Sequence, residues 1–183
     1  MNFRLCPSCG AEGLDFLDGK RWKCARCGFE YFHNVAAAAG VILDLSGEIV
    51  FIERARAPRK GKLGLPGGFV DPGERAEEAV IRECLEEVGW APPSIAFLGS
   101  FPNSYAYRGI KYNTCDLYFY YRFPEGAEAP AFTPKDGEAA AISLVALSAL
   151  MDEDLAFESL ARAIGDYRRL IARKPGKRGL AAP

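Results

Sequence analysis

The sequence has few features that would place the chain in a membrane or on a nucleic acid. No stretch approaches 18 uninterrupted apolar residues, and no N-terminal apolar run resembles a signal peptide. The 23 Lys and Arg nearly balance the 24 Asp and Glu, so the formal net charge is −1 and the whole chain has no field that attracts a polyanion. We therefore expect neither a membrane span nor a nucleic-acid partner, and any anionic ligand must be held by local groups.

Histidine is almost absent, because His33 is the only one. It could act as a base or as a metal ligand, but a hydrogen-bonded structural role is the simpler interpretation, and we leave it out of the site. Cysteine is more informative, since four of the six cysteines form two close pairs, CPSCG and CARCG, separated by 14 residues.

The four paired cysteines, Cys6, Cys9, Cys24 and Cys27, can close a tetrahedral Zn²⁺ site, and the Gly after each pair allows a tight backbone turn. Two disulfides or a redox pair are the alternatives. The paired spacing suits a metal site in a reducing compartment better than a disulfide framework, so we expect a cytoplasmic location. With four protein ligands no open position remains, and the predicted zinc is therefore structural.

The segment from Gly68 to Trp90, GFVDPGERAEEAVIRECLEEVGW, is the most informative stretch of the chain. Glycine and proline mark turns at its start, and none occurs from Glu74 to Val88. Gly89 follows, and glycine supplies the positive φ that a helix end often needs. The pattern predicts a loop followed by a helix that ends at Gly89.

On that helix, Glu83, Glu86 and Glu87 fall within an arc of roughly 100°. The neighbouring arc is apolar and is expected to enter a core; it contains Val80, Ile81, Cys84, Leu85 and Val88. Three carboxylates this close repel one another unless a cation lies among them, and Mg²⁺ with its oxygen ligands fits that need. The alternative is a solvated acidic face.

The order of residues in this segment resembles the Nudix box, G-x5-E-x7-R-E-U-x-E-E-x-G-U, in which U is a bulky apolar residue. The fixed positions are occupied by Gly68, Glu74, Arg82, Glu83, Glu86, Glu87 and Gly89, and the U positions by Cys84 and Trp90. The resemblance implies an α+β fold, an α/β/α sandwich with a mixed sheet. It also implies an enzyme that hydrolyses a nucleoside diphosphate linked to another moiety.

The resemblance also assigns roles. Glu83, Glu86 and Glu87 would bind Mg²⁺ or Mn²⁺, together with a backbone oxygen near Gly68. Glu74 would pair with or orient the carboxylates. Arg82 is expected to point away from the carboxylate arc and to tie the motif together through an ion pair. The general base would be Glu86, Glu87 or Glu138.

We expect three parts in the chain: a zinc ribbon over residues 1–33, the Nudix domain over 34–172, and a disordered tail over 173–183. The zinc ribbon is assigned by its resemblance to such units. Within the main domain the patterns predict a β-hairpin, three further strands and an amphipathic helix; they cover residues 35–44 with 48–54, then 95–101, 112–123, 139–147 and 155–172.

Candidate substrate-binding residues lie in two loops. Arg54 ends a predicted strand and resembles a phosphate-side residue, and the basic loop 56–62 follows it. Tyr105, Tyr107 and Arg108 gather in the predicted loop 102–109, where aromatic faces can stack on a ring and cations can meet phosphate. The alternatives are a solvated loop and a hairpin end that packs on its own sheet.

The substrate is less clear from sequence. NADH pyrophosphatases carry a zinc ribbon but also a Ser-Gln-Pro-Trp-Trp run, which the corresponding segment SFPNSYAYRG lacks. The layout is more similar to ADP-ribose and FAD pyrophosphatases, which also share a Phe-x-Ser-Leu turn such as Phe157–Leu160. NADH or NAD-capped RNA hydrolysis and a non-catalytic nucleotide sensor stay as alternatives, and the sequence leaves homodimerisation open.

Overall fold

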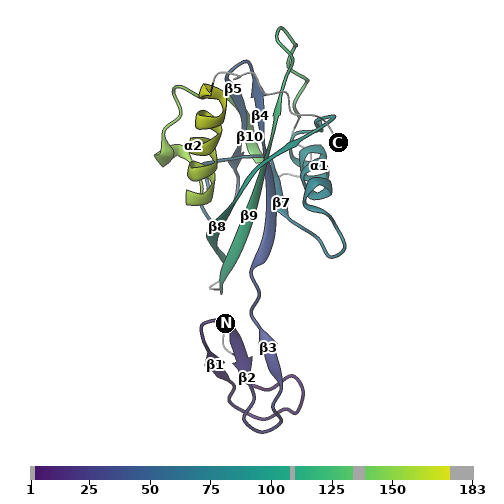
Figure 1. Cartoon of the computed structure of the whole chain (residues 1–183), viewed down its shortest axis with the longest axis vertical. Helices are drawn as coiled ribbons and strands as arrows, with labels where there is room; N and C mark the ends of the chain where they lie inside the picture. Colours follow the sequence, from purple (N-terminus) through teal and green to yellow (C-terminus); the bar gives the residue numbers. More distant parts are fainter. Residues whose placement is uncertain (1–2, 108–109, 134–138, 174–183) are drawn as a thin grey trace.

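The computed structural model describes residues 3–107, 110–133 and 139–173. It contains two separate sheets, and in Figure 1 the smaller lies apart from the larger. The small sheet is antiparallel and consists of β1 (Asp15–Leu17), β2 (Arg21–Lys23) and β3 (Glu30–Phe32). Its core is formed by Cys6, Leu14, Trp22 and Cys24, of which Trp22 is 6% exposed.

The large sheet has seven strands. Its main path runs in the order β10-β5-β4-β9-β8, while β6 pairs with β5 and β7 pairs with β4. Strands β4 and β9 are parallel and the other pairs are antiparallel, so the sheet is mixed. The strands are β4 (Ala36–Leu45), β5 (Glu48–Arg54), β6 (Leu63–Gly64), β7 (Gly67–Phe69), β8 (Ala96–Tyr107), β9 (Ile110–Arg122) and β10 (Ala139–Ala146).

Two helices cover opposite faces of this sheet, as Figure 1 shows: α1 (Ala76–Glu87) and α2 (Glu158–Ala172). A short 3₁₀ helix, η1 (Asp152–Asp154), precedes α2. Successive strand residues point to opposite faces. Val41 and Leu43 therefore join the core under α1, while Ile42 joins the core under α2. Burial on both faces explains the continuous apolar run of β4.

The predicted hairpin is formed by β4 and β5, with Ser46 and Gly47 at positive φ in its turn. Helix α1 lies within the predicted range, and Gly89 has φ +73° just after it. One expectation is wrong: Leu85 is 46% exposed and Ile81 is only partly buried, and neither belongs to the core under α1. The buried arc of α1 is narrower than predicted and contains Ala79, Val80, Cys84 and Glu87.

The loop predicted at residues 102–109 is also wrong over its described part, because β8 continues through Tyr107 and forms a long hairpin with β9. Pro102 lies within this strand. A proline is tolerated there because β8 is the edge of the sheet, where one side of the strand needs no ladder donors.

Neither helix in the described residues combines the length and the apolar content that crossing a membrane would need.

Candidate active site

Two glycines of β7 bring its backbone against both β4 and α1. Gly67 pairs with Gly40, and Gly68 pairs with Ala39. A Cβ on Gly67 would lie 2.2 Å from the Ala39 carbonyl oxygen, and one on Gly68 would lie 2.2 Å from Oε1 of Glu83. Only glycine allows this close approach, and it places the Glu83 carboxylate directly beside the strand backbone.

Arg82 is the centre of the acidic cluster on α1. Its Nε and Nη2 donate to the two carboxylate oxygens of Glu74 at 2.9 and 3.0 Å, a bidentate pair. Its Nη1 donates to Glu83 at 2.7 Å and to Glu86 at 3.3 Å, and Nη2 also reaches the Phe69 carbonyl at 3.1 Å. The expectation that Arg82 points away from the carboxylates is therefore wrong. It supplies the positive charge that the like charges require.

The Arg82–Glu74 pair favours the charged form of both groups. The hydrogen bond from Arg82 and a second one from the Asp71 backbone N–H lower the pKa of Glu74 below its ordinary value. Hydrogen bonding to Glu74 is in turn the main reason why the pKa of Arg82 is raised. This pair therefore holds α1 to the loop that precedes it.

The other two carboxylates have different surroundings. Glu87 is 4% exposed, and its Oε2 accepts a hydrogen bond from the Gly67 N–H at 2.8 Å. The side chain of Glu86 is 50% exposed at the outer edge of the helix. Cys84 lies in the core, where burial and then the charges of Glu87 and Glu83 raise its pKa to about 12. It therefore remains a thiol and acts as a core residue.

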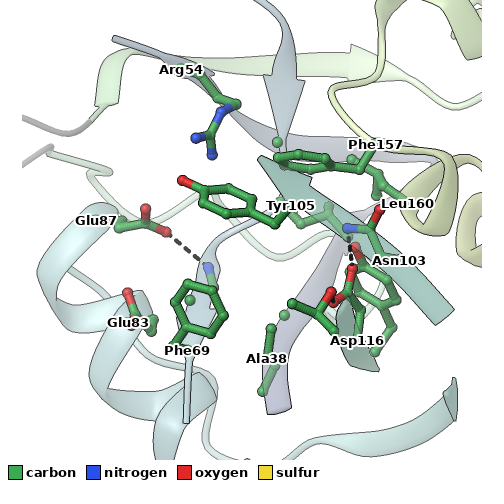
Figure 2. Close-up of a pocket in the computed structure, with 18 of the residues that line it drawn as sticks. Ala38, Arg54, Phe69, Glu83, Glu87, Asn103, Tyr105, Asp116, Phe157 and Leu160 are labelled. Carbon is green, nitrogen blue, oxygen red and sulfur yellow. Dashed lines mark hydrogen bonds between the residues drawn. The ribbon is translucent and has the colours of Figure 1, made fainter. Parts of the chain in front are cut away.

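A cavity of about 340 Å³ opens beside the carboxylates of Glu83 and Glu87, which form its acidic wall. This volume is typical of small-molecule sites. Figure 2 shows Glu83 and Glu87 on one side of it and the aromatic rings of Phe69, Tyr105 and Phe157 around it. The cavity is therefore acidic at one end and apolar in its middle.

The predicted substrate-binding residues lie in different places. Tyr105 and Arg54 line the cavity. The Tyr105 ring centroid is 5.8 Å from those of both Phe69 and Phe157. The guanidinium carbon of Arg54 lies 5.2 Å from the Phe157 centroid, and its Nε donates to the Pro58 carbonyl at 2.9 Å.

Three further predicted residues cannot be placed in the cavity. Tyr107 ends β8, and its side chain lies outside the described part of the structure. Arg108 and Glu138 lie outside the described residues altogether.

A buried polar cluster at the far side of the cavity was not predicted from the sequence. Asp116 accepts hydrogen bonds from Thr114 at 2.7 Å, from Asn103 at 2.8 Å and from Ser159 at 2.6 Å. Thr114, Asp116 and Tyr118 alternate along β9, a period-2 signal that was available in the sequence. Asn103 and Tyr105 alternate in the same way along β8, but the prediction of a loop for residues 102–109 assigned no strand period to them.

The side chains beside the cavity offer the kind of donor atom that a divalent cation prefers. Glu83, Glu86, Glu87 and the backbone of Gly68 offer hard oxygen donors, and the missing Cβ of Gly68 keeps the space beside Glu83 open. In the structure, Arg82 and the Gly67 N–H hold these carboxylates.

The four paired cysteines form the one group of three or more potential metal ligands that converges in the described residues, with the ligand atoms within 4.8 Å of one another. Sγ of Cys6 lies 3.7 Å from that of Cys27, and Sγ of Cys9 lies 3.8 Å from that of Cys24. These distances exclude disulfides and match the roughly 3.8 Å between ligands of a tetrahedral site with Zn–S bonds of about 2.3 Å.

The protein thus has a mixed sheet between two helices. One of these helices, α1, presents carboxylates to a ligand-sized cavity. The sequence model of the NUDIX domain matches residues 33–164, and the chain belongs to this family. The predicted fold class is confirmed.

Two relatives show how far the similarity extends. An ADP-ribose pyrophosphatase from Methanocaldococcus jannaschii is 44% identical over 71 residues, which are 39% of this chain and 41% of that protein. The NAD-capped RNA hydrolase NudC from Pseudomonas aeruginosa is 32% identical over 108 residues, 55% of this chain and 37% of that protein. The chain thus spans less than half the length of these relatives.

Solved structures support the fold. The NUDIX domain of Shewanella oneidensis NrtR, in complex with ADP ribose, has a TM-score of 0.64 at 20% identity and covers 76% of this chain and 90% of its own. A NUDIX hydrolase from Nitrosomonas europaea has a TM-score of 0.61 at 22% identity and covers 91% of this chain and 93% of its own.

Proposed function

We propose that this protein hydrolyses the diphosphate bond of a nucleoside diphosphate linked to another moiety, with ADP-ribose or FAD as the substrate. The observation that carries the proposal is the acidic wall, in which Arg82 and the Gly67–Gly68 backbone hold Glu83 and Glu87 at one end of a ligand-sized cavity. Family membership and the similarity to an ADP-ribose pyrophosphatase support it.

Glu83, Glu86, Glu87 and the Gly68 backbone would hold Mg²⁺ or Mn²⁺. When bound, such an ion neutralises phosphate oxygens and makes an attacking water more acidic. The chain's own part is orientation: Arg82 fixes the Glu83 carboxylate, and the Gly67 N–H fixes that of Glu87. A preorganised wall avoids reorganisation during the reaction.

The general base is proposed to be Glu86, Glu87 or Glu138. Glu86 keeps the widest access to water of the two that the structure describes, whereas one oxygen of Glu87 is committed to the Gly67 N–H. Glutamine substitutions at each position separate these candidates.

The aromatic middle of the cavity supports a nucleotide as the ligand. Phe69, Tyr105 and Phe157 present ring faces and edges on which a base can stack. Arg54 stands over Phe157 and offers a cation to phosphate. We propose that Tyr105, Tyr107, Arg54 and Arg108 bind the substrate.

A panel assay tests the function. ADP-ribose, FAD and NADH are incubated with the full chain and Mg²⁺ or Mn²⁺, and nucleotide products are measured. We expect turnover of ADP-ribose or FAD that falls about a hundredfold or more in Glu86→Gln. Glu77 lies on the same helix and pairs with Arg75 at the surface, so Glu77→Gln should retain activity. Equal, negligible turnover by wild type and Glu86→Gln across the panel contradicts the proposal.

Hydrolysis of NADH or of NAD-capped RNA is the second candidate, favoured by the 32% identity to NudC over 108 residues. Capped RNA is added to the panel at several salt concentrations. A steep loss of activity with salt on capped RNA, but not on free nucleotide, would support this candidate.

We also propose that residues 1–33 form a structural zinc ribbon, 34–172 the catalytic NUDIX domain and 173–183 a separate tail. The four cysteines support the first part, since their sulfur spacing fits tetrahedral zinc. The cytoplasmic location stays a prediction, the tail from residue 174 lies outside the described residues, and homodimerisation stays open.

A further inference from the structure

The feature that the proposed chemistry leaves unexplained is the buried carboxylate of Asp116. It is 7% exposed, yet it lines the cavity together with Asn103 and Thr114. All three side chains that donate to it are neutral. Burying a carboxylate without a cationic partner among the described residues is costly, so the position suggests a purpose beyond packing.

The hydrogen bonds to Asp116 are unevenly divided between its oxygens. Oδ2 accepts from both Asn103 and Ser159, whereas Oδ1 accepts from Thr114. A carboxylate offers about four acceptor positions. The contacts among described residues therefore use three and leave one on Oδ1.

The orientation of this carboxylate is fixed from three elements. Asn103 lies on β8, Thr114 on β9, and Ser159 in the first turn of α2. The N-terminal end of α2 also favours a nearby negative charge. Asp116 is thus an acceptor held in one orientation, and a buried polar group discriminates against a ligand that leaves it unpaired.

Its place in the cavity indicates which part of a ligand it meets. Figure 2 shows Asp116 and Asn103 on the opposite side of the cavity from Glu83 and Glu87, with Phe69 and Tyr105 between them. A diphosphate at the acidic wall leaves the nucleoside to extend toward Asp116.

We propose that Asp116 is a specificity-determining residue that accepts a hydrogen bond from an N–H or O–H donor of the substrate's nucleoside. This inference rests on the proposed function for its ligand class. The donor is the amino group of an adenine-type base or a ribose hydroxyl. A purely structural Asp116 would hold α2 to β9 and leave ligand preference unchanged.

The test measures dissociation constants by calorimetry in the Glu86→Gln background, where turnover does not interfere. The probes are ADP-ribose, its analogue with a carbonyl in place of the adenine amino group, and its analogue lacking the 2′-hydroxyl of the adenine-side ribose. Because hydrogen bonds to charged groups are strong, we expect one of the two changes to weaken binding about tenfold to a hundredfold. Which analogue loses affinity identifies the donor.

Asp116→Asn sharpens the test because it keeps the shape of the side chain. Asn103 and Ser159 both donate to the Oδ2 position, so the amide oxygen should take that place. The amide NH₂ then occupies the Oδ1 position, where the Thr114 hydroxyl can accept. The free position becomes a donor, and we expect the preference for the amino group over the carbonyl to invert, or the effect of the hydroxyl to shrink to within about threefold.

Asp44→Asn is the matched control, since Asp44 is another buried carboxylate that accepts from Tyr167 and Gly47, outside the cavity. Both variants should unfold at lower temperature, but only Asp116→Asn should change ligand preference. If Asp116→Asn does not fold, the analogue series in the Glu86→Gln background still overturns the inference when the affinities for all probes lie within about twofold.

Three outcomes overturn the inference: affinities for all probes within about twofold in the Glu86→Gln background, the same preferences in Asp116→Asn, or no measurable binding of any probe. Selective binding that depends on Asp116, without turnover by the wild type, would leave it intact and refute only the proposed hydrolysis.

Discussion

Arg82 uses all three guanidinium nitrogens within the acidic cluster and joins residues from the loop, the strand and the helix. Its bidentate pair with Glu74 has well-defined geometry, which distinguishes it from an ordinary surface ion pair. Glu74 is separated from Arg82 by eight positions and precedes the helix, so the pair closes the loop onto α1. The contribution of this pair to the free energy of unfolding should therefore depend on the charge of Glu74.

The stability contributed by the Arg82–Glu74 pair should depend on pH. Because Arg82 and then the Asp71 N–H lower the pKa of Glu74 in the folded state, this contribution to stability is present above the ordinary glutamate value of 4.5. It is lost as pH falls below 4.5, through the folded-state pKa. Glu74→Gln should lower the thermal midpoint at pH 7, and the difference from wild type should shrink by pH 3.5. Thermal unfolding across this range tests it, and a pH-independent difference would refute it.

At the scale of elements, the site depends on β7, which lies between β4 and α1. Its two glycines, Gly67 and Gly68, permit this close packing, and each has different neighbours. The Cβ of Gly67→Ala would meet backbone atoms of Ala39 and Gly40, which cannot move away. The Cβ of Gly68→Ala would meet the carboxylate of Glu83, whose side chain can rotate.

The two alanine substitutions should therefore separate stability from activity. Gly67→Ala should destabilise the fold by about 1–3 kcal/mol or more, as overpacking does. Gly68→Ala should destabilise the fold less than Gly67→Ala does. It should displace Glu83, however, and reduce at least tenfold the turnover of the nucleotide that the wild type hydrolyses. Denaturant unfolding and steady-state assays on both variants make the comparison. Equal losses of stability in the two would contradict this interpretation.

The predictions from sequence succeeded where an element's own period sets the geometry. Glu83 and Glu87 lie four positions apart on one helix, so their common face followed from about 100° per residue. Arg82 was misjudged because its long side chain bends back across the helix surface to Glu83 and Glu86. Leu85 was misjudged because the sheet covers a narrower stripe of α1 than the apolar pattern suggested.

At the scale of the whole molecule, the small sheet and the large sheet have separate cores. The small core contains four buried residues, two of which belong to the four-cysteine group. A unit of this size gains too little from apolar burial to fold alone, so zinc should supply much of its folding free energy.

Removal of zinc should affect the small sheet far more than the cavity. In a Trp90→Phe background, Trp22 is the one remaining tryptophan. We expect one zinc per chain, and chelation should expose Trp22 and shift its fluorescence to the red. Hydrolysis of free nucleotide should stay within about twofold, since the acidic wall and the cavity are built from the main domain.

Cys115→Ser is the control, because Cys115 lies outside the cysteine cluster and should leave zinc content unchanged. A protein prepared with zinc that contains none, or a Trp22 signal unaffected by chelation, would contradict the zinc ribbon.

The sequence by itself determined the family, the carboxylate-bearing helix and the four-cysteine cluster, because each depends on spacings of a few residues that helices and tight turns convert directly into geometry. Only the tertiary structure decided what the cavity contains. Asp116 meets Asn103 and Ser159 across 13 and 43 residues, and Tyr105 meets Phe69 and Phe157 from another strand. Such contacts depend on the register of β8 on β9 and on where α2 packs, and neither is encoded in any local period of the chain.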